Sequence, residues 1–216
     1  MPNIEEIHRE YHKGLREMAP ALAAEKYTMA MYSMASMNEI DEKPSLAVDW
    51  FRKAAAQDHL DALFVLGNYY ASGWEGIGRQ DMQEAVRYWR KSAELGYPDA
   101  QYNLGTCYMT GNGVGKDWVE AVKWLEKSAS VKHASSAFHL ALCYSNGGHG
   151  LQKDPRKATY WLLVASRYGD PQAQYTLSRY YENGIGVAMD RQKAMFWLKT
   201  AADNGSPEAI SDLQKR

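Results

Sequence analysis

Residues 100–129 read AQYNLGTCYMTGNGVGKDWVEAVKWLEKSA, two helical patterns joined by a glycine-rich turn. In the first pattern, Ala100, Leu104 and Tyr108 are spaced four residues apart, which places them on one face of a helix. A glycine follows where that helix should end, because glycine readily adopts the left-handed conformation of a C-terminal cap. Asp117 then has the position of an N-cap for a second helix. This stretch therefore predicts a helix–turn–helix unit.

The same unit recurs along the chain with a period of 36–38 residues. The small residues that open the first helices are Ala24, Ala62, Ala100, Ser136, Ala173 and Ala209. Each second helix carries an alanine and, three residues later, an aromatic residue: Ala47 and Trp50, Ala85 and Tyr88, Ala121 and Trp124, Ala158 and Trp161, Ala194 and Trp197. We expect these positions to pack successive helices together. A period of this length predicts an all-α solenoid in which each unit stacks on the next.

The repeat pattern also predicts the domain organisation, a single repeat domain over residues 1–216. Residues 3–20 carry apolar side chains at three- and four-residue spacing and are predicted to form an N-terminal capping helix. Five helix-pair repeats follow over residues 22–205, and residues 206–216 form a partial C-terminal repeat or cap. The first repeat is rich in methionine, which we interpret as core packing in preference to a binding patch.

Glycine followed by proline marks most junctions between repeats, as in Gly-Tyr-Pro-Asp at 96–99. This combination ends one helix and begins the next. Asp58 and Lys132 replace the glycine at two junctions. Because a side chain is strained in the left-handed conformation, these two turns are predicted to be strained or to adopt another shape.

Composition excludes several classes of function. The 216 residues are 45% apolar and 24% charged with a net charge of −1, which is typical of a folded globular protein. No basic patch indicates nucleic-acid binding, and no basic amphipathic helix or long apolar run indicates membrane binding. The N-terminus lacks the apolar segment of a secretory signal. We therefore expect a cytoplasmic protein, and a monomer.

The combined pattern resembles the Sel-one-like repeat family, which is related to the tetratricopeptide repeats. It reads small-x-x-x-Leu-Gly-x-x-Tyr-x-x-Gly and then Asp-x-x-x-Ala-x-x-Trp-Leu-x-x-Ala-Ala-x-x-Gly, and it extends over residues 22–213. The resemblance implies a right-handed α-solenoid superhelix whose first helices line a concave face. It also implies a scaffold or adaptor role, often in bacteria.

Some secreted relatives carry a disulfide within each repeat, and this chain departs from them. Cys107 and Cys143 have equivalent positions in adjacent repeats. Stacked helices are roughly 8–10 Å apart, whereas a disulfide spans at most about 7 Å between Cα atoms. Both residues are therefore predicted to be buried free thiols.

Motifs for catalysis and for metal binding are not apparent. No Gly-x-Ser-x-Gly or Ser-x-x-Lys sequence occurs. The stretch GNGVGKD at 111–117 lacks the order of a phosphate-binding loop and follows a predicted helix. His8 and His12 lie one helical turn apart, but no third metal ligand accompanies them. The sequence therefore predicts no catalytic site, no metal site and no cofactor.

By analogy with tetratricopeptide repeats, the groove is lined by the second, sixth and ninth residues after each opening small residue. An aromatic ladder is predicted at the second position: Phe64, Tyr102, Phe138 and Tyr175. Packing is an equally strong interpretation of these four rings. The other predicted contacts are Asn68, Thr106, Met109, Leu142, Arg179 and Glu182. Trp74 is a further candidate, because the turn at 73–78 is longer than the others.

The leading functional hypothesis is an adaptor that binds a protein or peptide in the concave groove, with no role for nucleic acid or membrane. A narrower alternative is a bacterial immunity protein that neutralises a cognate toxic effector. A hydrolase of the β-lactam type is a third possibility, which the family resemblance suggests and which would need residues from several repeats.

Overall fold

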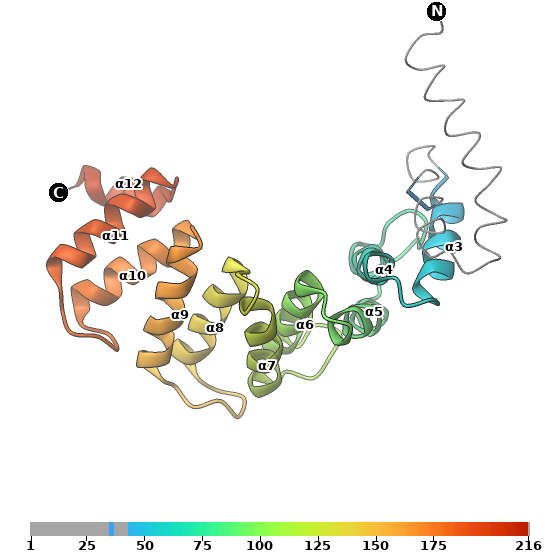
Figure 1. The fold of residues 1–216 in the computed structure, drawn as a ribbon, viewed down its shortest axis with the longest axis horizontal. Coiled ribbons are helices and arrows are strands. Elements are labelled where there is room, and N and C mark those ends of the chain that lie inside the picture. Colours follow the sequence, from blue (N-terminus) through green and yellow to red (C-terminus); the bar gives the residue numbers. More distant parts are fainter. Residues whose placement is uncertain (1–34, 37–42, 216) are drawn as a thin grey trace, which may run out of the picture. The chain divides into compact units, whose positions relative to one another are not determined.

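The computed structural model describes Ala35–Ser36 and residues 43–215, whose regular elements are the ten helices α3 to α12 (Figure 1). The all-α prediction is confirmed for these residues. The chain divides into two compact units between Tyr97 and Pro98. The predicted capping helix at 3–20, the four methionines of the first repeat and the His8–His12 pair lie outside the described residues.

The described part of the first unit contains α3 (Pro44–Ala55), α4 (Leu60–Ser72) and α5 (Met82–Glu94). Helix α4 packs against both α3 and α5. The second contact requires a glycine, because a Cβ atom at Gly67 would lie 2.4 Å from the indole ring of Trp89. Absence of a side chain at this position allows α4 and α5 to pack closely.

The second unit contains seven helices, which repeat one packing pattern. They are α6 (Pro98–Thr110), α7 (Trp118–Ala129), α8 (Ala134–Asn146), α9 (Pro155–Arg167), α10 (Pro171–Asn183), α11 (Arg191–Asp203) and α12 (Pro207–Gln214). The first helices are α6, α8, α10 and α12, and the second helices are α7, α9 and α11. Each second helix packs on the first helix of its own repeat and on that of the next repeat. This is the stacking that the period predicts.

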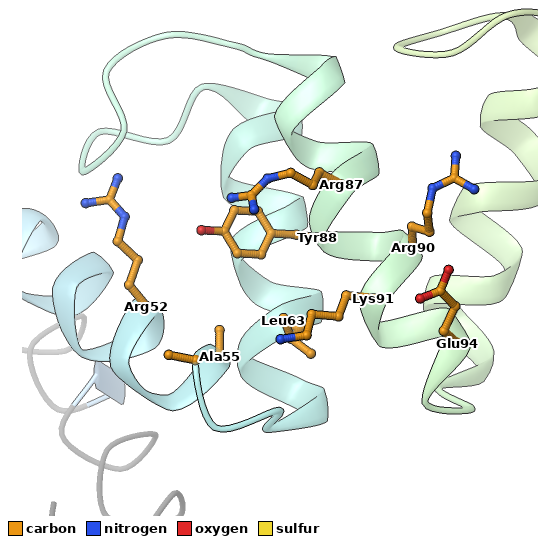
Figure 2. Close-up of a pocket in the computed structure, with 9 residues that line it drawn as sticks. Arg52, Ala55, Leu63, Arg87, Tyr88, Arg90, Lys91 and Glu94 are labelled. Carbon is orange, nitrogen blue, oxygen red and sulfur yellow. The ribbon is translucent and has the colours of Figure 1, made fainter.

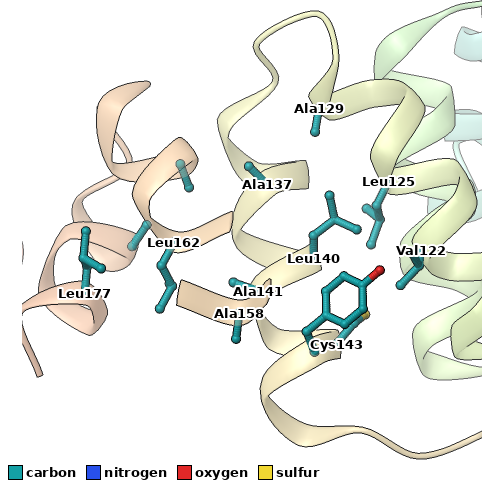
Figure 3. Close-up of a cluster of buried hydrophobic side chains, with 13 residues drawn as sticks. Val122, Leu125, Ala129, Ala137, Leu140, Ala141, Cys143, Ala158, Leu162 and Leu177 are labelled. Atoms are coloured by element: carbon teal, nitrogen blue, oxygen red, sulfur yellow. The ribbon is translucent and has the colours of Figure 1, made fainter. Parts of the chain in front are cut away.

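Leucine side chains from successive helices form the core of the second unit. Figure 3 shows Leu140 on α8 among Leu125 on α7, Leu162 on α9 and their neighbours. Leu140 and Leu125 are fully buried, and Leu162 is nearly so. Small residues such as Ala137 and Ala141 let the adjacent helices approach, so one core continues from α7 to α10. Leu198, Ala201 and Ala209 form a separate cluster between α11 and α12.

In the second helices, the side chain that fills the core is not the aromatic residue that the sequence predicts. Of the aromatic residues three positions after the alanine, Trp124 is buried, while Trp50, Tyr88, Trp161 and Trp197 lie half-buried at the core edge. The following residue is buried in every described repeat: Phe51, Trp89, Leu125, Leu162 and Leu198. One residue corresponds to a rotation of about 100° around a helix, which turns this second position toward the core.

The turns within the repeats close in a repeating manner. Asp117 receives backbone N–H groups on its side chain at the start of α7, and its own N–H donates to the carbonyl of Tyr108 at 2.9 Å. The equivalent pairs are Asp81 with Tyr70, Asp154 with Tyr144 and Asp190 with Tyr181. The predicted aspartate N-caps are confirmed. These bonds fix how each helix pair is joined.

The two junctions that lack glycine keep the left-handed turn and are therefore strained, which is the first of the two predicted outcomes. Asp58 has a φ angle of 61° and Lys132 one of 67°, in the left-handed region. The next residue is a histidine in both cases. His59 and His133 act as N-caps, since the imidazole Nδ1 accepts from a backbone N–H three residues later. The histidines therefore replace the Asp or Ser that caps other first helices.

Lys132→Gly is expected to raise the free energy of unfolding by about 1 kcal/mol, because glycine adopts the left-handed conformation without a steric penalty. Asp58→Gly should gain less, since it also removes the ion pair between Asp58 and Lys91. Urea denaturation of both variants measures the difference. If Lys132→Gly leaves the stability unchanged or lowers it, the turn is not strained as described.

Cys107 and Cys143 are free and buried, as predicted. Burial disfavours the thiolate, and it raises the pKa of Cys107 to about 11 and that of Cys143 to about 12. Both groups are therefore neutral thiols near pH 7. Their place in the core, and not reactivity, accounts for their presence.

Candidate partner-binding site

The first helices of the second unit carry a cluster of half-buried rings. The ring of Tyr102 on α6 lies edge-on to that of His139 on α8, with 5.2 Å between ring centroids. The ring of Phe138 also lies edge-on to the imidazole of His139, with 6.0 Å between centroids, and the ring of His133 lies 5.0 Å from that of Tyr102. Two predicted ladder residues, Tyr102 and Phe138, are thus brought together through a histidine that the sequence did not single out.

Carboxylates adjoin this ring cluster. Asp99 Oδ1 lies 3.2 Å from Nε2 of His133, so this ring contacts Asp99 while its Nδ1 caps α8. Burial raises the pKa of the Tyr102 hydroxyl, and the negative charge of Asp170 raises it further. Tyr102 is therefore an uncharged hydrogen-bonding group at neutral pH, held on an aromatic surface with an acidic edge.

Helix α10 contributes three more of the predicted residues. The hydroxyl of Tyr175 donates to Oδ2 of Asp212 on α12 at 3.0 Å, and burial together with this bond raises the pKa of Tyr175. Arg179 Nη1 lies 2.6 Å from a carboxylate oxygen of Glu182. These two residues form an exposed ion pair on the same helix, which leaves them reachable but already partnered.

Three further predicted contacts lie along α6 and α8. The hydroxyl of Thr106 donates to the carbonyl of Asn103 at 2.8 Å, within its own helix. Met109 packs against the core, and its carbonyl accepts from the indole of Trp118 at 3.0 Å. Leu142 is half-buried. Each of the three predicted residues keeps part of its surface exposed.

In the first unit, the predicted contacts are engaged in local packing. The ring of Phe64 lies 4.9 Å from that of Tyr97. Asn68 Oδ1 accepts from the indole of Trp89 at 3.1 Å, so Asn68 helps to hold that side chain in the core. Both Phe64 and Asn68 remain half-buried, and their role in binding stays a prediction.

Trp74 has a structural contact that its glycine-rich turn did not suggest. Its indole stacks on the ring of Tyr69 with 4.0 Å between centroids and an interplanar angle of 18°. It also packs at the edge of the first unit's core. The longer turn is therefore anchored by Trp74, and a role in partner binding stays a prediction.

Two exposed aromatic side chains were missed by the sequence analysis. Tyr160 on α9 is 59% exposed and Phe196 on α11 is 60% exposed. Both occur two residues after the alanine that marks each second helix. At that position the earlier repeats have charged residues, namely Asp49, Arg87 and Lys123. A comparison of the exposed positions between repeats would have found the change.

A pocket of about 350 Å³ lies in the first unit, where Figure 2 shows Arg52 on α3 opposite Arg87 on α5. Three of its basic groups already have carboxylate partners: Arg52 with Asp49, Arg87 with Glu84 and Lys91 with Asp58. A hydrogen bond to the hydroxyl of Tyr70 raises the pKa of Arg52. The charge around the pocket is balanced, so the pocket does not favour an anionic ligand.

Within residues 35–36 and 43–215, no three His, Cys, Asp or Glu side chains are grouped so that they could hold a metal ion. Of the helices in the described part of the chain, none has both the length and the apolar character that a membrane span needs.

Three known proteins illustrate what the chain is similar to. A Sel1 repeat protein of Oxalobacter formigenes has a crystal structure that matches with a TM-score of 0.76 and 29% identity, over 93% of this chain and 82% of that one. Chitin synthase regulatory factor 3 of Schizosaccharomyces pombe is 35% identical over 75 residues, and chitin synthase regulator SKT5 of Saccharomyces cerevisiae is 29% identical over 126 residues.

The matches to the fungal regulators cover 35% and 50% of this chain, but only 8% and 18% of those proteins. The chain thus spans less than a fifth of either. The family model of the Sel1 repeat matches five successive segments, residues 28–59, 60–97, 98–133, 134–170 and 171–206. The chain therefore belongs to the Sel1 repeat family.

Proposed function

We propose that this protein is an interaction scaffold, and that the first-helix face of its second unit binds a peptide segment of a partner protein. That face is defined by Tyr102, His139, Phe138, Leu142 and Tyr175. Sel1 repeats generally mediate protein–protein interaction. The observation that carries the proposal is the ring cluster of Tyr102, His139 and Phe138, whose three side chains are half-buried and in which Tyr102 and Phe138 pack on the core.

This half-buried arrangement is compatible with both interpretations of the aromatic ladder, packing and partner binding. Contacts with the core and with His139 hold the rings of Tyr102 and Phe138 in place before a partner arrives. A side chain that is already ordered loses little conformational entropy on binding. Aromatic residues also supply much of the binding energy in protein interfaces. The same rings can therefore stabilise the repeat and anchor a partner.

The proposed partner segment carries apolar side chains for the ring cluster and a donor for its acidic edge. Asp99, which contacts His133, and Asp170, which caps α10, give that edge negative charge, and the hydroxyl of Tyr102 is uncharged at neutral pH. In the partner segment, a lysine or arginine would meet the acidic edge, and an adjacent aliphatic residue would meet the ring cluster. A cytoplasmic, bacterial adaptor and a monomeric state belong to this proposal, as does a binding role in place of catalysis.

The double variant Tyr102→Ala/Phe138→Ala tests this function. Tagged wild-type and variant proteins are purified from the native host, and the proteins that accompany them are quantified by mass spectrometry. The variant is expected to lose at least nine-tenths of a specific partner, because truncating one aromatic anchor commonly costs about 2 kcal/mol or more of binding free energy.

Val131→Ala is the matched control, since Val131 is exposed and lies outside the first-helix face. It should retain the partner in full. Circular dichroism must show that the double variant is folded. Undiminished recovery of the same proteins by the folded double variant would exclude this face as the binding site.

The immunity-protein alternative is a special case of partner binding, in which the partner is a toxic effector. If a toxin is encoded beside this gene, cells that express the toxin should grow again when this protein is expressed with it. The Tyr102→Ala/Phe138→Ala variant should not restore their growth. A β-lactam hydrolase would instead cleave a chromogenic β-lactam. If this protein hydrolyses the β-lactam and a single substitution on a first helix abolishes the hydrolysis, the scaffold proposal is wrong and the protein is an enzyme.

A further inference from the structure

The second helices of the last two complete repeats present aromatic side chains on their exposed face. Tyr160 and Phe196 stand at a position that is charged in the preceding repeats, and each is about 60% exposed. Each ring lies edge-on to the tryptophan that follows it, with 5.1 Å between centroids. Both side chains are thus braced by a neighbour and remain open to solvent.

The turn between α10 and α11 carries two more exposed apolar side chains. The hydroxyl of Thr159 on α9 donates to the carbonyl of Ile185 at 2.8 Å, which holds the turn against the start of α9. From there the chain continues through Met189 into α11. Ile185 is 38% exposed and Met189 is 62% exposed. The turn is therefore held at the start of α9 and leads directly into α11.

Both of these second helices are rich in exposed basic residues. Helix α9 contains three basic residues and no acidic one, and α11 contains three basic residues and one acidic residue, whereas α7 has two of each. The six basic side chains are exposed: Arg156, Lys157, Arg167, Arg191, Lys193 and Lys199. Lys193 pairs with Asp190 at 3.1 Å. The aspartates that precede both helices are N-caps, which directs their carboxylates to backbone amides.

The basic residues lie close to the exposed rings. Arg156 and Arg167 come four residues before and seven residues after Tyr160, which places all three on one face of α9. Lys199 follows Phe196 by three residues on α11. A hollow of about 360 Å³ beside Arg156 is lined by the α10–α11 turn. The surface thus combines apolar anchors, positive charge and a recess.

We infer that this face, defined by Arg156, Tyr160, Ile185, Phe196 and Lys199, is a second binding surface, and that it binds an acidic segment of a partner protein with aromatic or aliphatic side chains. Carboxylates would meet Arg156 and Lys199, while the apolar side chains would contact Tyr160 and Phe196. The surface lies on second helices, whereas the face described above lies on first helices. One chain can then hold two partners, or two segments of one partner.

A protein segment fits this face better than a membrane or a nucleic acid. Membrane insertion needs a wide apolar face on a helix, and the apolar faces of α9 and α11 are buried in the core. Single-stranded nucleic acid binds along a positively charged groove and stacks successive bases on aromatic rings. Here the exposed side chains also include the aliphatic Ile185 and Met189, which offer no flat ring to a base and suit protein side chains better.

Fluorescence anisotropy with a labelled random copolymer of glutamate and tyrosine tests the inference on the full chain. Tyr160→Ser/Phe196→Ser leaves the charge unchanged and is expected to weaken copolymer binding at least tenfold. Val131→Ser is the matched control, because Val131 is also 59% exposed, and it should bind like the wild type. Arg156→Glu/Lys199→Glu should weaken binding as well and reduce its dependence on salt.

Further measurements distinguish this inference from binding at the first-helix face and from binding of membranes or nucleic acid. Tyr102→Ala/Phe138→Ala should bind the copolymer normally, so failure of the first-helix proposal and failure of this one are distinguishable. Equal affinity of the wild type and the Tyr160→Ser/Phe196→Ser variant, or no binding by the wild type, would overturn the inference. It would also be overturned if phosphatidylserine vesicles or single-stranded DNA bound in place of the copolymer and lost binding in that variant.

Discussion

Leu140→Ala is expected to lower the free energy of unfolding by about 3 kcal/mol, because it removes a fully buried side chain and leaves a cavity. Leu140 is surrounded by Leu125 and Leu162 on the two adjacent second helices, as Figure 3 shows. Nearest-neighbour contacts supply much of the stability of a repeat protein. Loss at this position should therefore weaken the contacts of α8 with both α7 and α9.

Leu142→Ala is the matched control for this prediction. It makes the same substitution two residues later on α8, at a half-buried position of the first-helix face. The stability loss should stay below about 1 kcal/mol, while partner binding should weaken. Urea denaturation of the two variants separates packing from recognition. If both variants lose the same stability, the division between core and first-helix face is wrong.

Gly186→Ala is expected to cost about 3 kcal/mol, since two unfavourable effects coincide. The φ angle of Gly186 is 67°, which strains any residue with a side chain. In addition, an added Cβ would lie 2.1 Å from the carbonyl oxygen of Pro155, so the turn or the start of α9 would have to shift. The shift would also displace Ile185, which hydrogen-bonds to Thr159.

Gly205→Ala isolates the first of these effects. Gly205 has a φ angle of 88°, but an added Cβ there would meet nothing within 4 Å. Only the conformational penalty of about 1 kcal/mol should result. Thermal or urea unfolding of the two variants gives the difference that the close approach to Pro155 causes. Equal stability losses would mean that the turn packs less tightly against α9 than the structure indicates.

The repeat could be predicted in detail because each unit must bury the same faces. A small residue and a leucine equivalent to Ala100 and Leu104 recur at a fixed phase in the other described repeats, and Ala100 and Leu104 are fully buried. The aspartate N-caps followed from the same phase. The fully buried second-helix position could not be predicted, because tryptophans such as Trp161 stand next to it. The large ring of such a tryptophan packs at the core edge, while the following Leu162 fills the centre.

The candidate site was harder to predict, since its features arise between repeats. The contact of Tyr102 with His139 joins two helices, and neither residue alone indicates it. The stacking of Trp74 on Tyr69 depends on how a turn folds back, which the helical pattern does not describe. Tyr160 departs from the charged residues at the equivalent positions of earlier repeats, and that signal was present in the sequence.

Site-specific photo-crosslinking tests the central claim most directly, that the first-helix face of the second unit contacts a partner protein. A benzophenone amino acid replaces Phe138 in the full chain, and the protein is irradiated in its native host. The account predicts a discrete crosslinked product at this position, which the Tyr102→Ala background reduces. The same probe at Val131 should give none of that product. A product of equal yield from Val131, or no product from Phe138 in the folded protein, would contradict the account.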